Sequence, residues 1–172
     1  FRAQNGAWRN KYAGQFGIKF FDAFSFENLT LQSEFNFARP FTYSHFKPTQ
    51  NYAHYAQPLA HPLGTSFLES ISFIRYRRDR WTANIKLIHA KYGGEIAGDT
   101  TNYGSNIFIP YDENYKELGN DIAQGNTSNL QIIDLRVGYI VNPNTNMKIE
   151  LGLIKRSLSD RNIFDDNQYL FF

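Results

Sequence analysis

The sequence predicts an all-β protein, an antiparallel transmembrane β-barrel or a portion of one. Three observations favour this fold class. Apolar and polar residues alternate along several strand-length segments, the connections between these segments alternate between short and long, and aromatic residues make up 17% of a chain whose mean hydropathy is only −0.49. A barrel wall that faces lipid outside and water inside requires this balance, because half of each strand must be polar.

The clearest strands lie in residues 129–154, where two alternating runs flank a turn-like segment at 142–146. The apolar face of the first run reads Ile133, Leu135, Val137, Tyr139 and Val141, and that of the return run reads Met147, Ile149, Leu151 and Leu153. Alternation with a period of two on both sides of a turn predicts a β-hairpin. In this hairpin Arg136 and Glu150 become diagonal neighbours, so we expect an ion pair between them.

The same alternation predicts five further strands, at Tyr12 to Phe21, Asn28 to Phe37, Phe67 to Arg77, Trp81 to Tyr92 and Asn167 to Phe172. In the run from Phe67 the alternation is weak, and Ile71 and Phe73 are its expected apolar face. The residues expected to line the interior of a barrel are Lys19, Glu34, Lys86 and Arg136.

The connections are short at 22–27, 78–80 and 142–146 and long at 38–66 and 93–128. Antiparallel strands place successive connections at opposite ends of a sheet, so all the short ones share one end. Short periplasmic turns and long extracellular loops are typical of outer-membrane barrels. A soluble β-sandwich or lipocalin-like barrel is the alternative, but neither has a reason to sort its loops by length.

We expect residues 1–172 to be one partial barrel domain that continues N-terminally in the native protein. Seven strands are predicted, whereas bacterial single-chain barrels have an even number, and the run at 167–172 is too short to cross the hydrocarbon. A weak strand within residues 1–9, or a chain that truly ends at Phe172, is the alternative. The sequence contains no apolar run long enough for a transmembrane helix.

Composition excludes several classes of function. The net charge of +2 is too small to indicate nucleic acid as a partner. The absence of cysteine excludes disulfides, thiolate chemistry and cysteine-containing metal sites. We expect no cofactor, and membrane lipid is the expected partner.

The first long loop contains the candidate ligand-binding residues, since aromatic rings beside amides are how proteins hold sugars. These candidates are Tyr43, His45, Tyr52, His54, Tyr55 and His61. The alternative is a structured loop whose rings and prolines cover the barrel mouth. The three histidines are spaced unlike a compact metal site, so no metal is expected.

Two charged clusters lie outside these candidates. Acidic residues of the second long loop are Glu95, Asp99, Asp112, Glu113, Glu117 and Asp121. Their spacing does not match an EF-hand, so a solvated loop is favoured over Ca²⁺ binding, and packing of this loop on the basic first loop would close the mouth. Basic residues at one short turn are Arg75, Arg77, Arg78 and Arg80, which are expected to meet lipid phosphates or a periplasmic partner.

The sequence does not indicate an enzyme. The one arrangement to consider is Ser70 or Ser72 with His89 on neighbouring predicted strands, but no nucleophile elbow or other motif accompanies these residues. We therefore expect no catalytic residues.

The segments Ala38-Arg39-Pro40-Phe41-Thr42-Tyr43-Ser44 and Asn51 to Gly64 resemble a group of Bacteroidota outer-membrane proteins, the gliding-motility RemB-like barrels, which are similar to the Wzi-type capsule-assembly barrels. The resemblance covers residues 28–92. It implies the C-terminal part of a longer barrel in the outer membrane. It also implies a non-enzymatic surface role, in which long loops contact polysaccharide or the outer-membrane and periplasmic proteins of a motility, secretion or capsule assembly. A transport channel is the alternative.

Overall fold

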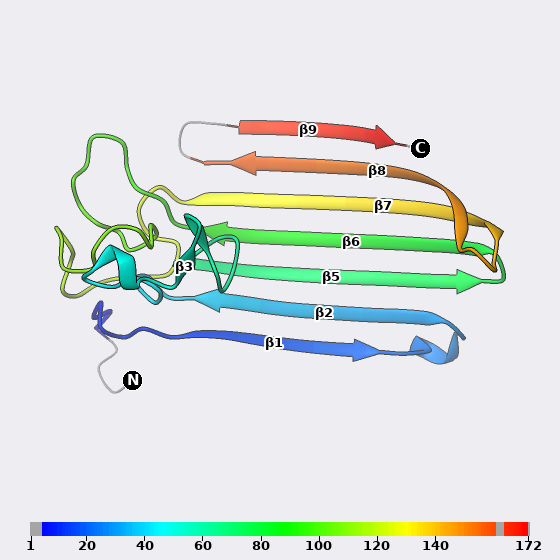
Figure 1. The fold of residues 1–172 in the computed structure, drawn as a ribbon, viewed down its shortest axis with the longest axis horizontal. Helices are drawn as coiled ribbons and strands as arrows, with labels where there is room; N and C mark the ends of the chain where they lie inside the picture. Colours follow the sequence, from blue (N-terminus) through cyan, green and yellow to red (C-terminus); the bar gives the residue numbers. More distant parts are fainter. Residues whose placement is uncertain (1–4, 161–163, 172) are drawn as a thin grey trace.

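The computed structural model describes residues 5–160 and 164–171, which form one seven-stranded antiparallel sheet and a set of loops at one end of it (Figure 1). The sheet has the order β1 (Ala13–Phe20), β2 (Leu29–Ala38), β5 (Phe67–Arg78), β6 (Trp81–Tyr92), β7 (Ser128–Asn142), β8 (Met147–Ser159) and β9 (Phe164–Phe171). The predicted all-β, antiparallel class is confirmed. Within the described residues the sheet is open, and no helix is long and apolar enough to cross a membrane.

Each predicted strand is present, and two differ clearly in length. β8 continues to Ser159, five residues beyond the predicted end of the hairpin at Ile154. The last strand begins at Phe164 rather than Asn167, because Asp165 and Asn167 continue the ladder opposite Leu158 and Arg156. Charged and amide residues made this part of the strand look like a polar link. Residue 172, with which the predicted strand ends, lies outside the described residues.

The first long connection contains three short elements that the sequence analysis did not predict. Two of them, β3 (Ala53–His54) and β4 (Gln57–Pro58), pair as a small hairpin. The third is the 3₁₀ turn η2 (Pro48–Gln50), and a comparable turn, η1 (Ala23–Ser25), lies between β1 and β2.

The predicted sorting of connections is confirmed. The connections at 21–28, 79–80 and 143–146 share one end of the sheet, here called the turn end, whereas 39–66 and 93–127 share the other, the loop end (Figure 1). β8 ends at Ser159 and β9 begins at Phe164, so four residues join them, of which 161–163 lie outside the described residues.

The strand register gives the sheet two different faces. One row of directly paired residues is apolar on all seven strands: Phe20, Leu31, Ile74, Ile85, Leu135, Leu153 and Leu170. The face that carries this row is here called the apolar face. The opposite, polar face carries the four predicted interior residues Lys19, Glu34, Lys86 and Arg136.

The expected apolar face of β5 is wrong. Ile71 and Phe73 pair with Ile88 and Lys86, so they lie on the polar face. The apolar face of β5 carries Ser70 and Ser72 before Ile74 and Tyr76. The two serines concealed the alternation that the other strands show.

The apolar band runs obliquely across the hydrogen-bonded rows. On β1 it is centred on Ile18, and the row of Ile18 reaches Lys155 on β8. The apolar run on β8, Met147 to Leu153, is centred at position 150. From β1 to β8, which are five strands apart in the sheet, the centre of the apolar band therefore shifts by five residues relative to the hydrogen-bonded rows. With about 3.3 Å per residue and about 4.8 Å between strands, this drift corresponds to a tilt of roughly 35°.

Burial is concentrated at the loop end rather than on a face of the sheet. The side chains of Phe41, Phe67, Tyr103 and Ile107 are at most 8% exposed, and all four lie in or beside the long loops. The apolar face has no cover among the described residues: Phe16 on β1 is 68% and Ile149 on β8 is 68% exposed.

Candidate functional site

The long loops and the segment before β1 pack into one assembly, here called the loop cap and defined as residues 5–12, 39–66 and 93–127. Backbone hydrogen bonds join its parts: the N–H of Phe41 donates to Gly104 O at 2.9 Å, and that of Asn120 donates to Gly6 O at 2.8 Å. The side-chain amide of Asn51 donates to Ile107 O at 3.1 Å. The considered packing of the second loop on the first is thus confirmed, although no ion pair joins the two loops among the described residues.

An aromatic cluster joins the segment before β1 to the second loop. The ring of Trp8 stacks on Tyr111 with centroids 4.7 Å apart. The Lys11 ammonium lies 3.9 Å from the Tyr111 centroid and donates to Ser44 O at 3.0 Å. Burial lowers the pKa of Lys11 to about 8. A weak strand within residues 1–9 was the alternative to a partial barrel. Residues 5–9, the part of this segment that the structure describes, form no strand.

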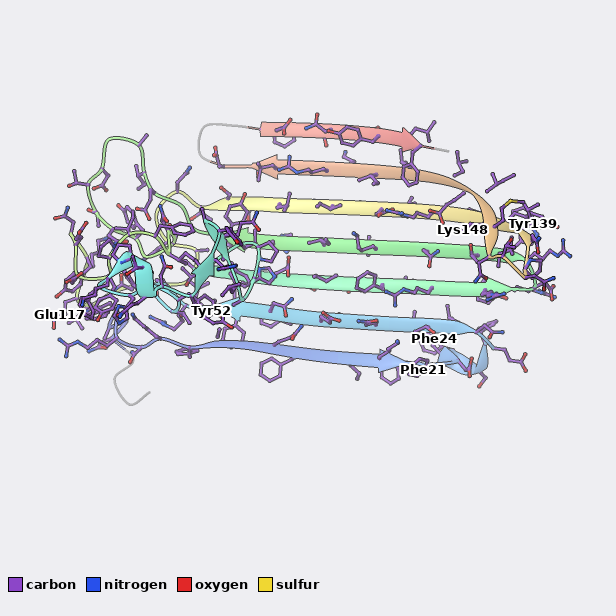
Figure 2. The ribbon with its side chains drawn as sticks, viewed as in Figure 1. Phe21, Phe24, Tyr52, Glu117, Tyr139 and Lys148 are labelled. Carbon is purple, nitrogen blue, oxygen red and sulfur yellow. The ribbon has the colours of Figure 1, made fainter. Side chains whose placement is uncertain are left out.

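Three of the candidate ligand-binding residues line one hollow at the surface of the loop cap. Tyr43, His45 and Tyr52 surround a space of about 320 Å³, together with Gln50. The rings of Tyr43 and Tyr52 lie 5.8 Å apart and are tilted by 33°. Burial, followed by the neighbouring Tyr52, raises the pKa of the Tyr43 phenol. Figure 2 shows Tyr52 at the inner side of the loops, where they meet the strands. Aromatic faces beside an amide are therefore available to a ligand.

The other three candidates lie elsewhere. The rings of His54 and Tyr55 contact each other at 4.2 Å in the β3–β4 hairpin, and Tyr55 is 89% exposed. His61 turns toward the sheet, where its Nε2 lies 2.9 Å from a carboxylate oxygen of Glu69. The same Glu69 oxygen accepts from the amide of Asn36 at 3.0 Å. His61 thus anchors the first loop to the polar face, and together with Tyr43 it lines a second hollow of about 310 Å³.

Two acidic residues of the second loop, Glu95 and Asp99, stabilise the structure of the loop itself. Asp99 accepts from the Tyr103 hydroxyl at 2.6 Å and from the Thr101 N–H at 2.9 Å, and these bonds lower the pKa of Asp99 to about 2. Glu95 accepts from the Ser105 hydroxyl at 2.9 Å. The described part of the chain holds no group of three or more His, Asp or Glu residues that could bind a metal ion.

The polar face carries a charged network toward the turn end. Arg136 donates to both oxygens of Asp134, at 2.8 and 2.7 Å. The expected ion pair of Arg136 with Glu150 is confirmed at 3.6 Å. Lys148 also pairs with Glu150, and Lys86 lies 3.9 Å from Asp134. The contact between Arg136 and Glu150 was predictable because a short turn sets the register of their strands.

The expected arginine cluster at the turn end is divided between the faces. Arg75 and Arg77 lie on the polar face and Arg78 on the apolar face. The guanidinium of Arg75 bonds to the Gln32 side-chain oxygen at 3.1 Å and lies 4.3 Å from the Phe73 ring centroid. Arg80 lies in the turn and reaches Val141 O at 3.5 Å. The alternation along β5 turns neighbouring arginines to opposite sides, so they are not one patch.

Ser70 and His89 are directly paired on the apolar face, whereas Ser72 pairs with Leu87. Glu69, the acid beside Ser70 in the chain, faces the opposite way and bonds to His61. The described residues therefore bring Ser70 and His89 together without a carboxylate that could orient the histidine.

The comparisons with known proteins give no relative for this chain. No protein-family model matches the sequence, and neither the curated proteins nor the solved structures contain a match.

Proposed function

We propose that the sheet is part of the wall of a transmembrane β-barrel in the outer membrane of a Gram-negative bacterium. The observation that carries the proposal is the uncovered apolar band, which is bordered by polar residues at the loop end and has a polar face behind it. Its oblique course supports the same view, because strands of membrane barrels are tilted by about 35–45°. A soluble sandwich would need a second layer over Phe16 and Ile149.

Aromatic residues at the turn end support the proposal further. Tyr139 and Trp81 pack edge to face with centroids 5.0 Å apart, and Phe21 and Phe24 are exposed by 68% and 81% (Figure 2). Membrane barrels carry such girdles where the hydrocarbon meets the headgroups. The loop end would then face the cell exterior and the turn end the periplasm.

Cysteine labelling of the native gene product tests this placement. Ile18 and Lys19 are neighbours on β1, both exposed in the sheet but on opposite faces. In permeabilised membranes, Lys19→Cys is expected to react with a water-soluble maleimide, whereas Ile18→Cys reacts with a lipid-soluble maleimide only. In intact cells, an impermeant maleimide should label Leu118→Cys in the second loop but not Asn144→Cys in the turn at 143–146.

The unsubstituted gene product provides the background: residues 1–172 contain no cysteine, and this control measures any labelling of the rest of the native chain. Equal labelling of positions 18 and 19 by the water-soluble reagent, or recovery of the folded protein without detergent, contradicts the membrane placement. Labelling of Asn144→Cys in intact cells contradicts the orientation.

The proposed role is a non-enzymatic surface scaffold whose loop cap contacts polysaccharide or partner proteins of a motility, secretion or capsule assembly, as the RemB-like and Wzi-type resemblance implies. The hollow of Tyr43, His45 and Tyr52 supports polysaccharide contact, since two rings and the Gln50 amide converge there. A transport channel is the weaker proposal, because the loop cap is anchored to the polar face through His61 and Glu69.

Truncation of Tyr52 to alanine is expected to weaken the binding of capsular polysaccharide from the producing bacterium about tenfold. This corresponds to the loss of about 1.4 kcal/mol of binding free energy at a central aromatic contact. Biolayer interferometry with immobilised polysaccharide measures the change. Tyr55→Ala is the matched control, because Tyr55 is 89% exposed and lies outside the hollow. Equal losses in the two variants, or none in Tyr52→Ala, would exclude the hollow as the contact.

A further inference from the structure

The polar face contains a hollow in which positive charge exceeds negative charge. Its volume is about 260 Å³, and its charged lining residues are Arg75, Lys86, Asp134, Arg136, Lys148 and Glu150. Four cations thus face two carboxylates. From this arrangement we propose a binding site for a doubly charged tetrahedral oxyanion, either a free sulfate or hydrogen phosphate ion or a phosphate monoester group carried by a sugar.

Both carboxylates of the hollow are already satisfied by two of the cations. Asp134 is held by two hydrogen bonds from Arg136, and Glu150 pairs with Lys148 and lies 3.6 Å from Arg136. The surplus charge therefore belongs to Arg75 and Lys86. Lys86 approaches Asp134 only to 3.9 Å, and among the described residues Arg75 has no carboxylate partner.

Arg75 is held in place but not saturated. One terminal nitrogen donates to Gln32, and the guanidinium plane lies over the Phe73 ring. A guanidinium has five N–H donors in a fixed fork that suits oxyanions, and one that is already positioned loses less entropy on binding. The structure shows this single hydrogen bond for Arg75 within the described chain, which leaves donors for a ligand.

The side chain between the two arginines supplies a further donor. Asn84 is directly paired with Arg75 on one side and Arg136 on the other, so its amide lies between them on the same face. Its amide makes no hydrogen bond within the described residues, although it lines the hollow. Arg75, Asn84 and Lys86 therefore present convergent donors, the arrangement that oxyanion recognition requires. The site is built by the sheet itself and does not depend on the membrane proposal.

Isothermal titration of the purified native gene product with sodium sulfate and sodium phosphate, at constant ionic strength set by sodium chloride, tests the site. Saturable binding of the divalent ions is expected, with no saturable heat from chloride. Arg75→Gln should weaken sulfate binding by at least about tenfold, because a charge-assisted hydrogen bond is lost. Lys86→Gln is expected to weaken sulfate binding as well, and it tests the site independently if Arg75→Gln does not fold.

Arg77→Gln is the matched control, since Arg77 lies two residues along β5 on the same face but outside the hollow. An equal loss in this variant would show diffuse attraction and overturn the proposal, as would an absence of saturable binding in the unsubstituted protein. Competition by glucose 6-phosphate, a dianion at pH 8, at similar concentrations would identify a sugar-borne group as a ligand. Binding of the inorganic ions alone would identify a free ion. Either result supports the oxyanion site.

Discussion

Replacing Val137 by arginine is expected to lower the free energy of unfolding in a phospholipid bilayer by about 2–4 kcal/mol. Val137 lies near the centre of the apolar band on β7 and is 51% exposed, because no described part of the chain covers it. A guanidinium at this position would replace apolar surface at the depth where a charge is most costly. Guanidinium titration in vesicles, followed by heat-modifiable mobility on gels, measures the loss.

Thr82→Arg is the control for this substitution. Thr82 has nearly the shape of valine and lies on the neighbouring strand β6, but it faces the polar side, where it pairs with Gly138. Glu150 lies on the other side of Gly138 and offers a carboxylate to the new charge. Thr82→Arg is therefore expected to change the free energy of unfolding by less than about 1 kcal/mol. A loss of similar size in both variants would contradict a lipid-facing band.

Gly104→Ala is expected to destabilise the loop cap by about 2–5 kcal/mol, through overpacking together with a left-handed backbone. A Cβ atom at position 104 would lie 2.6 Å from ring atoms of Phe41, and the φ angle of Gly104 is +68°. Phe41 is fully buried and cannot retreat without breaking its hydrogen bond to Gly104 O. The rate of tryptic cleavage after Lys116, in the same loop, measures opening of the cap.

Gly98→Ala separates the two causes. Gly98 has a φ angle of +82° but no atom within 4 Å of a Cβ. Only the backbone cost of about 1–2 kcal/mol is therefore expected at this position. If the two variants are cleaved at equal rates, Phe41 does not hold the second loop in the way the structure indicates.

The strands could be predicted from the sequence wherever one face is continuously apolar. Between Ile133 and Tyr139 each alternate residue is large and apolar, so strand and face were both evident. On β5 the serines at 70 and 72 interrupt the pattern, and the strand was found but its faces were exchanged. On β9 Asp165 and Asn167 resembled a loop, because only their partners on β8 show that they continue a ladder.

The charged contacts of the sheet were predictable only where a short turn fixes the register of the strands. The turn at 143–146 places Arg136 beside Glu150, and this pair was expected. The approach of Arg75 to Asn84 and Arg136 depends in addition on the register between β6 and β7, which are joined by the long connection at 93–127. Such a connection leaves the register open, so the charged hollow could not be found from spacing along the chain.

The directions of the two edge strands determine whether the number of additional strands in a closed barrel is odd or even. β1 and β9 run in the same direction, from the loop end to the turn end, because the sheet has seven strands (Figure 1). Joining them directly would create a parallel seam. A second copy of the sheet, rotated about an axis along the membrane normal, would repeat that seam instead of removing it. An all-antiparallel cylinder that includes this sheet must therefore place an odd number of other strands between β9 and β1.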